Sequence, residues 1–128
     1  MKKILLIEDN PGILQLMESA FSSEEYKDCE YQSAPTGIKA IKLLNVYNFD
    51  LVIAEEDLSD IKGHEIAEWM GYNENHRDTP FILLVSEESL KLFPELRQIG
   101  VITTLLQKPI TRLKFNTTVI MIMNMKRK

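Results

Sequence analysis

Short apolar runs alternate along this chain with segments in which apolar residues recur every three or four positions. The runs fit strands, and the longer segments fit helices with one apolar face. Two of the runs, residues 51–54 and 81–85, are wholly apolar, as expected for strands covered on both faces. The segment 28–33 is more polar, which predicts a strand at the edge of a sheet. The predicted strands are residues 3–7, 28–33, 51–55, 81–85 and 103–106.

The segments between these strands predict helices, and one follows each strand. They cover residues 11–22, a second segment that starts at 36–37 and ends by 48, a short segment around 66–70, a segment after Ser86, and residues 110 to about 125. Pro94 should shorten the fourth helix, because an interior proline removes a backbone donor. The strand–helix alternation with short connections predicts an α/β fold, a parallel sheet with helices on both faces. We expect a single domain, 1–128, and see no output domain after the last helix.

Charged and hydroxyl residues gather where the predicted strands end. In the segment DLVIAEEDLSDIKG, residues 50–63, an apolar strand breaks directly into three acids. A buried strand cannot hold three carboxylates, so these acids should lie at its carboxyl end, where open α/β sheets place their sites. The groups that follow the first, third, fourth and fifth strands are Glu8 and Asp9, then Glu55, Glu56 and Asp57, then Ser86, and finally Lys108 with Pro109.

These groups converge on one pocket if the four strands are neighbours. Clustered carboxylates repel one another, and Mg²⁺ with oxygen ligands would relieve that repulsion. Lys108 adds a second positive charge and Ser86 adds a hydroxyl donor. Together these are the parts of a phosphoryl-transfer site.

The chain resembles the receiver domain of bacterial response regulators. The resemblance covers nearly the whole chain and depends on four motifs in order, KILLIEDN at 3–10, DLVIAEEDLSDIKG at 50–63, PFILLVS at 80–86 and QKPI at 107–110. It implies a flavodoxin-like doubly wound domain with strand order 2-1-3-4-5. It also implies a role in two-component (phosphorelay) signalling, with a histidine kinase or a downstream effector as the protein partner.

The resemblance also assigns expected roles to residues of the pocket. Glu8 and Asp9 match the acidic pair that holds the metal, and Asp57 matches a position that lends it a backbone carbonyl. Ser86 matches the hydroxyl residue that senses the phosphoryl group. Lys108 matches the lysine that contacts it, and the proline after this lysine often follows a cis peptide bond.

The position of the phosphoacceptor departs from the family pattern. Counting back eight residues from Gly63 places the acceptor at position 55, where the family has aspartate and this chain has Glu55. The extra methylene moves the carboxylate outwards by roughly 1.5 Å, and a misplacement of about 1 Å can cost about a hundredfold in rate. Glu55 can instead pair with Lys108 or Ser86. It would then imitate the phosphorylated state weakly, with one negative charge in place of about −1.5 to −2.

Two further departures weaken the expected switch. Leu105 stands at the position of the family's aromatic switch residue, and Glu87 follows the hydroxyl position, where a small residue is usual. We therefore expect a pseudo-receiver, a protein-interaction module that signals without phosphorylation and has no enzymatic activity beyond, at most, its own phosphorylation. Any Mg²⁺ held by Glu8, Asp9, Glu55 and Asp57 should bind weakly, with a dissociation constant in the millimolar range, about −4 kcal/mol.

Two other functions remain open. The chain can be a working phosphoacceptor that takes a phosphoryl group from a histidine kinase with Mg²⁺. It can also be an unrelated flavin or nucleotide carrier, although EDNPG, rather than a glycine-rich phosphate loop, follows the first strand.

Each site residue also has a purely structural interpretation. Glu8 and Asp9 can cap the first helix, Lys108 can be only a structural partner of Glu55 and Asp9, and Ser86 can be only a helix cap. Glu56, Glu87 and Glu88 are expected to be solvated. His64 and His76 are expected in polar surroundings without the spacing of metal ligands, and Trp69 is expected to pack half-buried at the surface.

The composition limits the classes of partner and the cellular compartment that the sequence predicts. The net charge of −4 argues against a general nucleic-acid-binding surface. Cys29 is the single cysteine and cannot form an internal disulfide, which suits a reducing cytoplasm. No apolar stretch is long enough to cross a membrane.

The last helix is apolar on two sides, and such a helix is usually covered on both. We expect its first stripe, with Leu113 and Met121, to face the sheet. The second stripe, with Phe115, Val119 and Ile122, should then mediate a homodimer. In the family, the surface of the fourth helix, fifth strand and fifth helix often forms such contacts.

Overall fold

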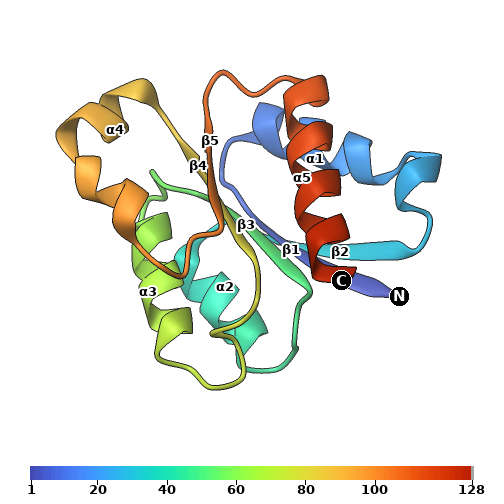
Figure 1. Ribbon diagram of the computed structural model, residues 1–128, viewed down its shortest axis with the longest axis horizontal. Coiled ribbons are helices and arrows are strands. Elements are labelled where there is room, and N and C mark those ends of the chain that lie inside the picture. The colour runs from blue at the N-terminus through green and yellow to red at the C-terminus, as the bar shows by residue number, and fades with distance from the viewer. Residues whose placement is uncertain (128) are drawn as a thin grey trace.

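Within residues 1–127, which the computed structural model describes, five parallel strands form one sheet (Figure 1). Their order across the sheet is β2-β1-β3-β4-β5, which confirms the expected order. The central strands β3 and β4 are buried along their whole length, whereas β2 lies at the edge, as its polar content predicted. The strands are β1 (Lys2–Ile7), β2 (Cys29–Ala34), β3 (Leu51–Glu55), β4 (Phe81–Val85) and β5 (Thr104–Gln107).

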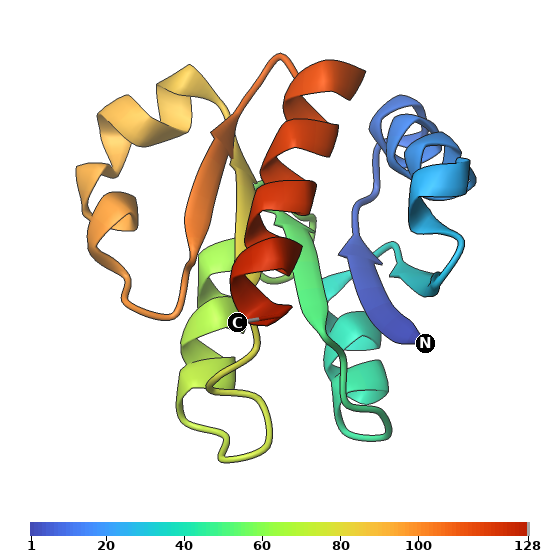
Figure 2. The ribbon, with the colours of Figure 1, turned by 45° about the vertical axis from the view of Figure 1, so that its right-hand side comes forward.

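Helices cover both faces of the sheet, as Figures 1 and 2 show. Helices α1 (Pro11–Phe21) and α5 (Arg112–Arg127) lie on one face. Helices α2 (Gly37–Leu44), α3 (Gly63–Gly71) and α4 (Glu87–Leu92) lie on the other. Two 3-10 turns, η1 (Glu24–Tyr26) and η2 (Pro94–Gln98), follow α1 and α4. The start of η2 at Pro94 confirms that this proline ends the fourth helix early. None of the described helices is both long and apolar enough to span a membrane.

Two apolar layers sandwich the sheet, because successive side chains along a strand point to opposite faces. In β1, Leu5 and Ile7 pack into the layer beneath α2 and α3, and Ile4 and Leu6 pack into the layer beneath α1 and α5. All four side chains are fully buried. Because the strands are parallel, the last residue of each lies at the same, carboxyl edge of the sheet.

Helix α5 packs with the opposite face from the one predicted. Phe115 and Val119 are fully buried against the sheet, whereas Leu113 is 79% and Met121 is 53% exposed. Phe115 meets Phe21 of α1 edge to face, with ring centroids 5.7 Å apart. The periodicity of a helix with two apolar stripes does not show which stripe is buried. In this structure the stripe with Phe115 is buried, and Phe115 contacts α1. The buried stripe therefore cannot form the predicted dimer contact.

His76 is buried rather than placed in polar surroundings, so that expectation was wrong. Its side chain is 2% exposed, and its Nε2 lies 2.6 Å from the carbonyl oxygen of Leu44. Since a carbonyl only accepts, Nε2 carries the proton and donates to it. Trp69 is partly buried, as expected, with its ring centroid 5.9 Å from that of His76. His76 thus ties the segment after α3 to the end of α2.

Candidate functional site at the carboxyl edge of the sheet

Three of the predicted site residues meet at the carboxyl edge of the sheet. Glu55 is the last residue of β3, Glu8 directly follows β1, and Lys108 directly follows β5. Strands β1 and β3 are neighbours, so the two glutamates leave the sheet side by side. The long side chain of Lys108 reaches Glu55 from β5, past the intervening strand β4.

Glu55 is held by partners on both of its carboxylate oxygens. Its Oε1 pairs with the Nζ of Lys108, and its Oε2 accepts the backbone N–H of Asp57 at 3.0 Å. The Glu55 side chain is 3% exposed and the Lys108 side chain 26% exposed. Attraction between opposite charges grows as water is excluded. The pairing of Glu55 with Lys108 that the sequence predicted is therefore present and largely shielded.

Glu8 is equally buried but less well satisfied. Its exposure is 1%, and its Oε2 accepts the backbone N–H groups of Asp9 at 3.1 Å and Asn10 at 3.4 Å. Its Oε1 has no hydrogen-bond partner. Burial, and then the nearby negative charge of Glu55, raises the pKa of Glu8 to about 7, although Lys108 and the two N–H groups oppose the shift. Glu8 therefore changes its protonation state near neutral pH.

The other predicted site residues lie around this centre. Asp9 is exposed, and Asn10 rather than Asp9 caps α1. Ser86 caps α4, because its Oγ accepts the N–H of Ser89 at 3.0 Å. Ser89 in turn donates from its hydroxyl to Asp57 at 3.4 Å.

The side chain of Asp57 is exposed and has partners other than the Glu55 pair. One of its oxygens lies 3.3 Å from the Nζ of Lys62, and the other accepts the hydroxyl of Ser89. The carboxylate is thus already engaged by a cation and a hydroxyl donor. What Asp57 contributes to Glu55 is its backbone N–H.

Glu56 was expected to be solvated, and this expectation was wrong. It is 2% exposed, its Oε1 accepts the N–H of His64 at 2.8 Å, and its Oε2 lies 2.6 Å from the Nδ1 of the same residue. Its carbonyl oxygen also accepts the N–H of Gly63 at 3.0 Å. Glu56 therefore fixes the start of α3 to the end of β3. The sequence held no local signal for this contact, because Glu56 and His64 lie eight residues apart in different segments.

The close approach of α3 to β3 explains why position 63 is a glycine. A Cβ atom added to Gly63 would lie 2.5 Å from the carbonyl oxygen of Glu55 and 2.7 Å from a methyl group of Leu83. Both distances are shorter than real Cβ contacts, and the first neighbour is backbone. The absence of a side chain at residue 63 thus lets α3 start directly beside Glu55.

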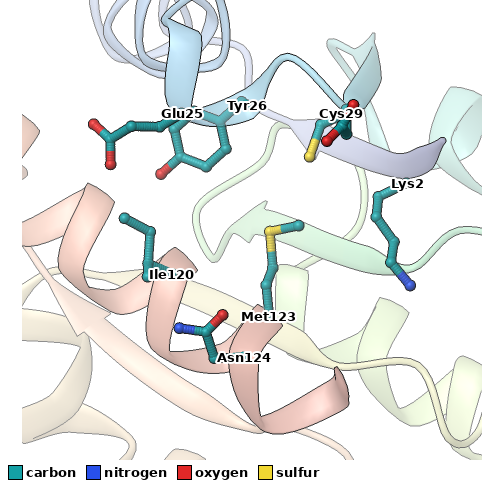
Figure 3. Close-up of a pocket in the computed structure, with 8 residues that line it drawn as sticks. Lys2, Glu25, Tyr26, Cys29, Ile120, Met123 and Asn124 are labelled. Carbon is teal, nitrogen blue, oxygen red and sulfur yellow. The ribbon is translucent and has the colours of Figure 1, made fainter. Parts of the chain in front are cut away.

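A cavity of about 280 Å³ lies at the opposite, amino edge of the sheet (Figure 3). Tyr26 and Cys29 face Ile120 and Met123 of α5 across it. Tyr26 is 3% exposed and donates its hydroxyl to the side-chain oxygen of Asn116 at 2.9 Å. Burial, more than the neighbouring Glu25, raises the pKa of Tyr26 to about 12. This cavity contains none of the predicted site residues, so we place the candidate site at the carboxyl edge.

Comparison of the sequence with models of protein families identifies the family of this chain. Residues 4–120 match the model of the response regulator receiver domain. The chain belongs to this family. Among curated relatives, the polar-differentiation response regulator DivK of Brucella ovis is 24% identical over 118 residues, which span 92% of this chain and 93% of DivK.

Solved receiver structures share the fold. The chemotaxis response regulator CheY4 of Vibrio cholerae superposes with a TM-score of 0.83 at 23% identity, covering 95% of this chain and 98% of that one. The receiver domain of the sensor histidine kinase PA1611 of Pseudomonas aeruginosa PAO1 superposes with a TM-score of 0.78 at 24% identity, covering 92% and 93%. The PA1611 structure has a magnesium ion coordinated in its active-site cleft.

Receiver domains bind Mg²⁺ at their active site, so the residues present here can be tested against that ion. Among the described residues, no three His, Cys, Asp or Glu side chains are arranged to hold a metal. Glu55 is engaged on both oxygens and Asp57 is engaged by Lys62 and Ser89. Oε1 of Glu8 has no hydrogen-bond partner, and Asp9 is exposed. This arrangement fits a magnesium ion poorly, because the ion prefers several oxygen ligands in octahedral geometry.

Other features expected of a receiver are present or replaced. The Lys108–Pro109 peptide bond is cis, as the resemblance implied. Leu105 is partly buried against the apolar layer beneath α2 and α3, in place of an aromatic switch residue. Glu87 stands exposed in the first turn of α4 and pairs with Lys91 at 3.4 Å.

Proposed function

We propose that this receiver domain of two-component systems is a pseudo-receiver, a protein-interaction module whose signal does not depend on phosphorylation. The observation that supports this most is the buried ion pair between Glu55 and Lys108. In receivers, the lysine at this position contacts the phosphoryl group, and here a carboxylate of the chain itself takes that place. The positive charge of Lys108 is then paired within the chain itself, without a phosphoryl donor.

The reactivity of Glu55 supports the same proposal. Nucleophilic attack on phosphorus needs a free carboxylate oxygen within about 3–3.5 Å of the reacting atom. Both oxygens of Glu55 already have partners, and its side chain is 3% exposed. A donor would have to separate the carboxylate from Lys108 before attack. That separation would leave two charges incompletely paired in a shielded place, which costs several kcal/mol, on the order of 3–5.

The partners proposed are proteins, a histidine kinase or a downstream effector, in the cytoplasm. The face made by α4, β5 and α5 exposes large apolar side chains, namely Leu92, Leu113 and Met121. Exposed apolar side chains of this kind support contact with a protein partner. The net charge of −4 does not favour a nucleic-acid partner.

The alternative is a receiver that takes a phosphoryl group from a histidine kinase with Mg²⁺. Intact-mass measurement with acetyl phosphate and Mg²⁺ separates the two. We expect wild type to gain no phosphoryl group. Glu55→Asp should gain one slowly, because the shorter side chain leaves Lys108 free to neutralise charge on the transferring group. Adding Lys108→Ala to Glu55→Asp should abolish that gain.

The matched control is Glu55→Gln, which keeps the length of the side chain and removes its charge and nucleophilicity. It should remain unlabelled. Efficient labelling of wild type that disappears in Glu55→Gln or in Asp57→Asn would establish the phosphorylatable alternative and reject the pseudo-receiver.

A further inference from the structure

A groove of about 470 Å³ lies between α3 and η2, away from the Glu55 pair. Its apolar part consists of Phe93, Leu96 and Ile99. Leu96 forms the buried floor at 1% exposed, and Phe93 is 48% exposed. Clefts of this size take small groups that are mainly apolar. The groove is thus suited to an aliphatic side chain that enters from solvent.

The charged groups that line the groove are acidic. Glu68 of α3 and Glu95 of η2 contribute carboxylates, and the third titratable group there is His64. The Nδ1 of His64 is bound to Glu56, and its Nε2 lies 3.9 Å from Glu68. The nearby cation Arg97 lines a different hollow, beside β5. The groove therefore favours an apolar group that carries positive charge beside it.

The first turn of α5 presents a surface with the complementary chemistry. Leu113 is 79% exposed and stands between Arg112 and Lys114. Arg112 donates to the hydroxyl of Ser19 at 3.0 Å, and Lys114 donates to the carbonyl of Gln107 at 3.0 Å. Both cations are thus held against the molecule on either side of the leucine. The helix start adds a partial positive charge of its own.

We propose that the groove between α3 and η2 of one copy receives Leu113 of a second copy. Arg112 and Lys114 of the second copy would then lie near Glu68 and Glu95 of the first. The inference rests on the proposed function, because it names a second copy of the chain as a partner of the interaction module. Two chains of net charge −4 repel each other overall, so contact is favoured where a basic patch meets an acidic one.

The two surfaces differ, so the contact is head-to-tail rather than symmetric. Each added copy leaves one free groove and one free Leu113, and the assembly grows unless its rotation closes a ring. A contact built around one side chain is small, so it should be weak, with a dissociation constant on the order of 100 µM. Because charge contributes, salt should weaken it.

Sedimentation velocity on the full chain tests the proposal through complementation. Wild type should exceed the monomer mass of 14.8 kDa as its concentration rises towards about 1 mM. Leu113→Asp has an intact groove and no leucine to insert, and Phe93→Asp has the reverse defect. Each variant alone should stay monomeric, and an equimolar mixture should form a dimer that does not grow further.

Matched controls are Met121→Asp on the outer face of α5 and Leu92→Asp on α4, which change exposed apolar residues outside the two surfaces. Both should associate as wild type does. Glu95→Lys is a second groove variant, and it too should be monomeric alone and recover with Leu113→Asp. Thermal unfolding of each variant verifies that it is folded.

Monomeric wild type throughout this range would overturn the inference, as would a mixture of Leu113→Asp and Phe93→Asp that remains monomeric. Loss of association in Met121→Asp or Leu92→Asp, with no complementation, would assign the contact to the α4–β5–α5 face instead. These outcomes are separate from the labelling test. A monomeric chain that takes no phosphoryl group leaves the pseudo-receiver standing, and a labelled chain that assembles head-to-tail rejects only the proposed function.

Discussion

The ends of β1 and β3 carry two buried glutamates that differ in their partners. Glu55 at the end of β3 has a cation on one oxygen and a backbone N–H on the other. Glu8 at the end of β1 has two backbone N–H groups on one oxygen and nothing on the other. Both residues are buried, so burial alone does not distinguish them.

The difference shows that the partners of a buried carboxylate, and not its burial alone, determine its charge and pKa. At Glu55 a cation, Lys108, pairs with one carboxylate oxygen and offsets the loss of water. Oε1 of Glu8 has no such partner. Burial, and then the nearby negative charge of Glu55, raises the pKa of Glu8 to about 7. One strand end thus holds an ion pair, and the next holds a carboxyl group with a raised pKa.

Removal of the cation should have the largest effect. Lys108→Met leaves Glu55 buried without its partner, and the free energy of unfolding in urea at pH 8 should fall by about 3 kcal/mol. The lysine is one quarter exposed, so we expect the lower end of the range for a buried pair.

The double variant Lys108→Met with Glu55→Gln provides the control for that loss. It has no unpaired charge, and it should recover stability to within about 1 kcal/mol of wild type. A loss below about 1 kcal/mol in Lys108→Met would mean that solvent screens the pair as it does at a surface, and the contrast between the two strand ends would fail.

A second prediction concerns pH and Glu8. Its pKa rises from 4.5 to about 7 on folding, so the folded state holds this proton more tightly. The stabilisation is complete below pH 4.5 and is lost as pH rises through about 7, a total of about 3 kcal/mol. Glu8→Gln should remove this dependence. Relative to wild type, the variant should therefore gain stability steadily between pH 5 and 8, in urea unfolding at each pH.

Asp9→Asn is the matched control, because it removes a neighbouring carboxylate that is exposed. Its difference from wild type should stay flat over the same pH range. If the Glu8→Gln difference were also flat, Lys108 and the backbone N–H groups would fully offset the burial of Glu8. The contrast between the two glutamates would then fail.

The sequence predicted the parallel sheet and the gathering of Glu55 and Lys108 at one of its edges for physical reasons. Apolar runs that end in charge mark the carboxyl ends of parallel strands, and such ends share one edge of the sheet. The resemblance to receivers supplied the order of the strands. It also supplied the cis bond before Pro109, which the structure confirms.

Two features could not be read from the pattern. Glu56 looked like a solvated acid because nothing local shows that His64 and the start of α3 fold back over it. Helix α5 is apolar on two sides, so its periodicity allowed either face inside, and contact with α1 accompanies the face that is buried. Both errors concern tertiary contacts between segments, which periodicity within one segment does not record.

The central claim, that Glu55 and Lys108 occupy the place of a phosphoryl group, is tested most directly with beryllofluoride and Mg²⁺. Amide spectra of wild type should show no saturable shifts at Glu55, Ser86 or Lys108 up to millimolar Mg²⁺, because both oxygens of Glu55 are engaged. Glu55→Asp should show such shifts. Saturable shifts in wild type at all three residues, at micromolar Mg²⁺, would contradict the account.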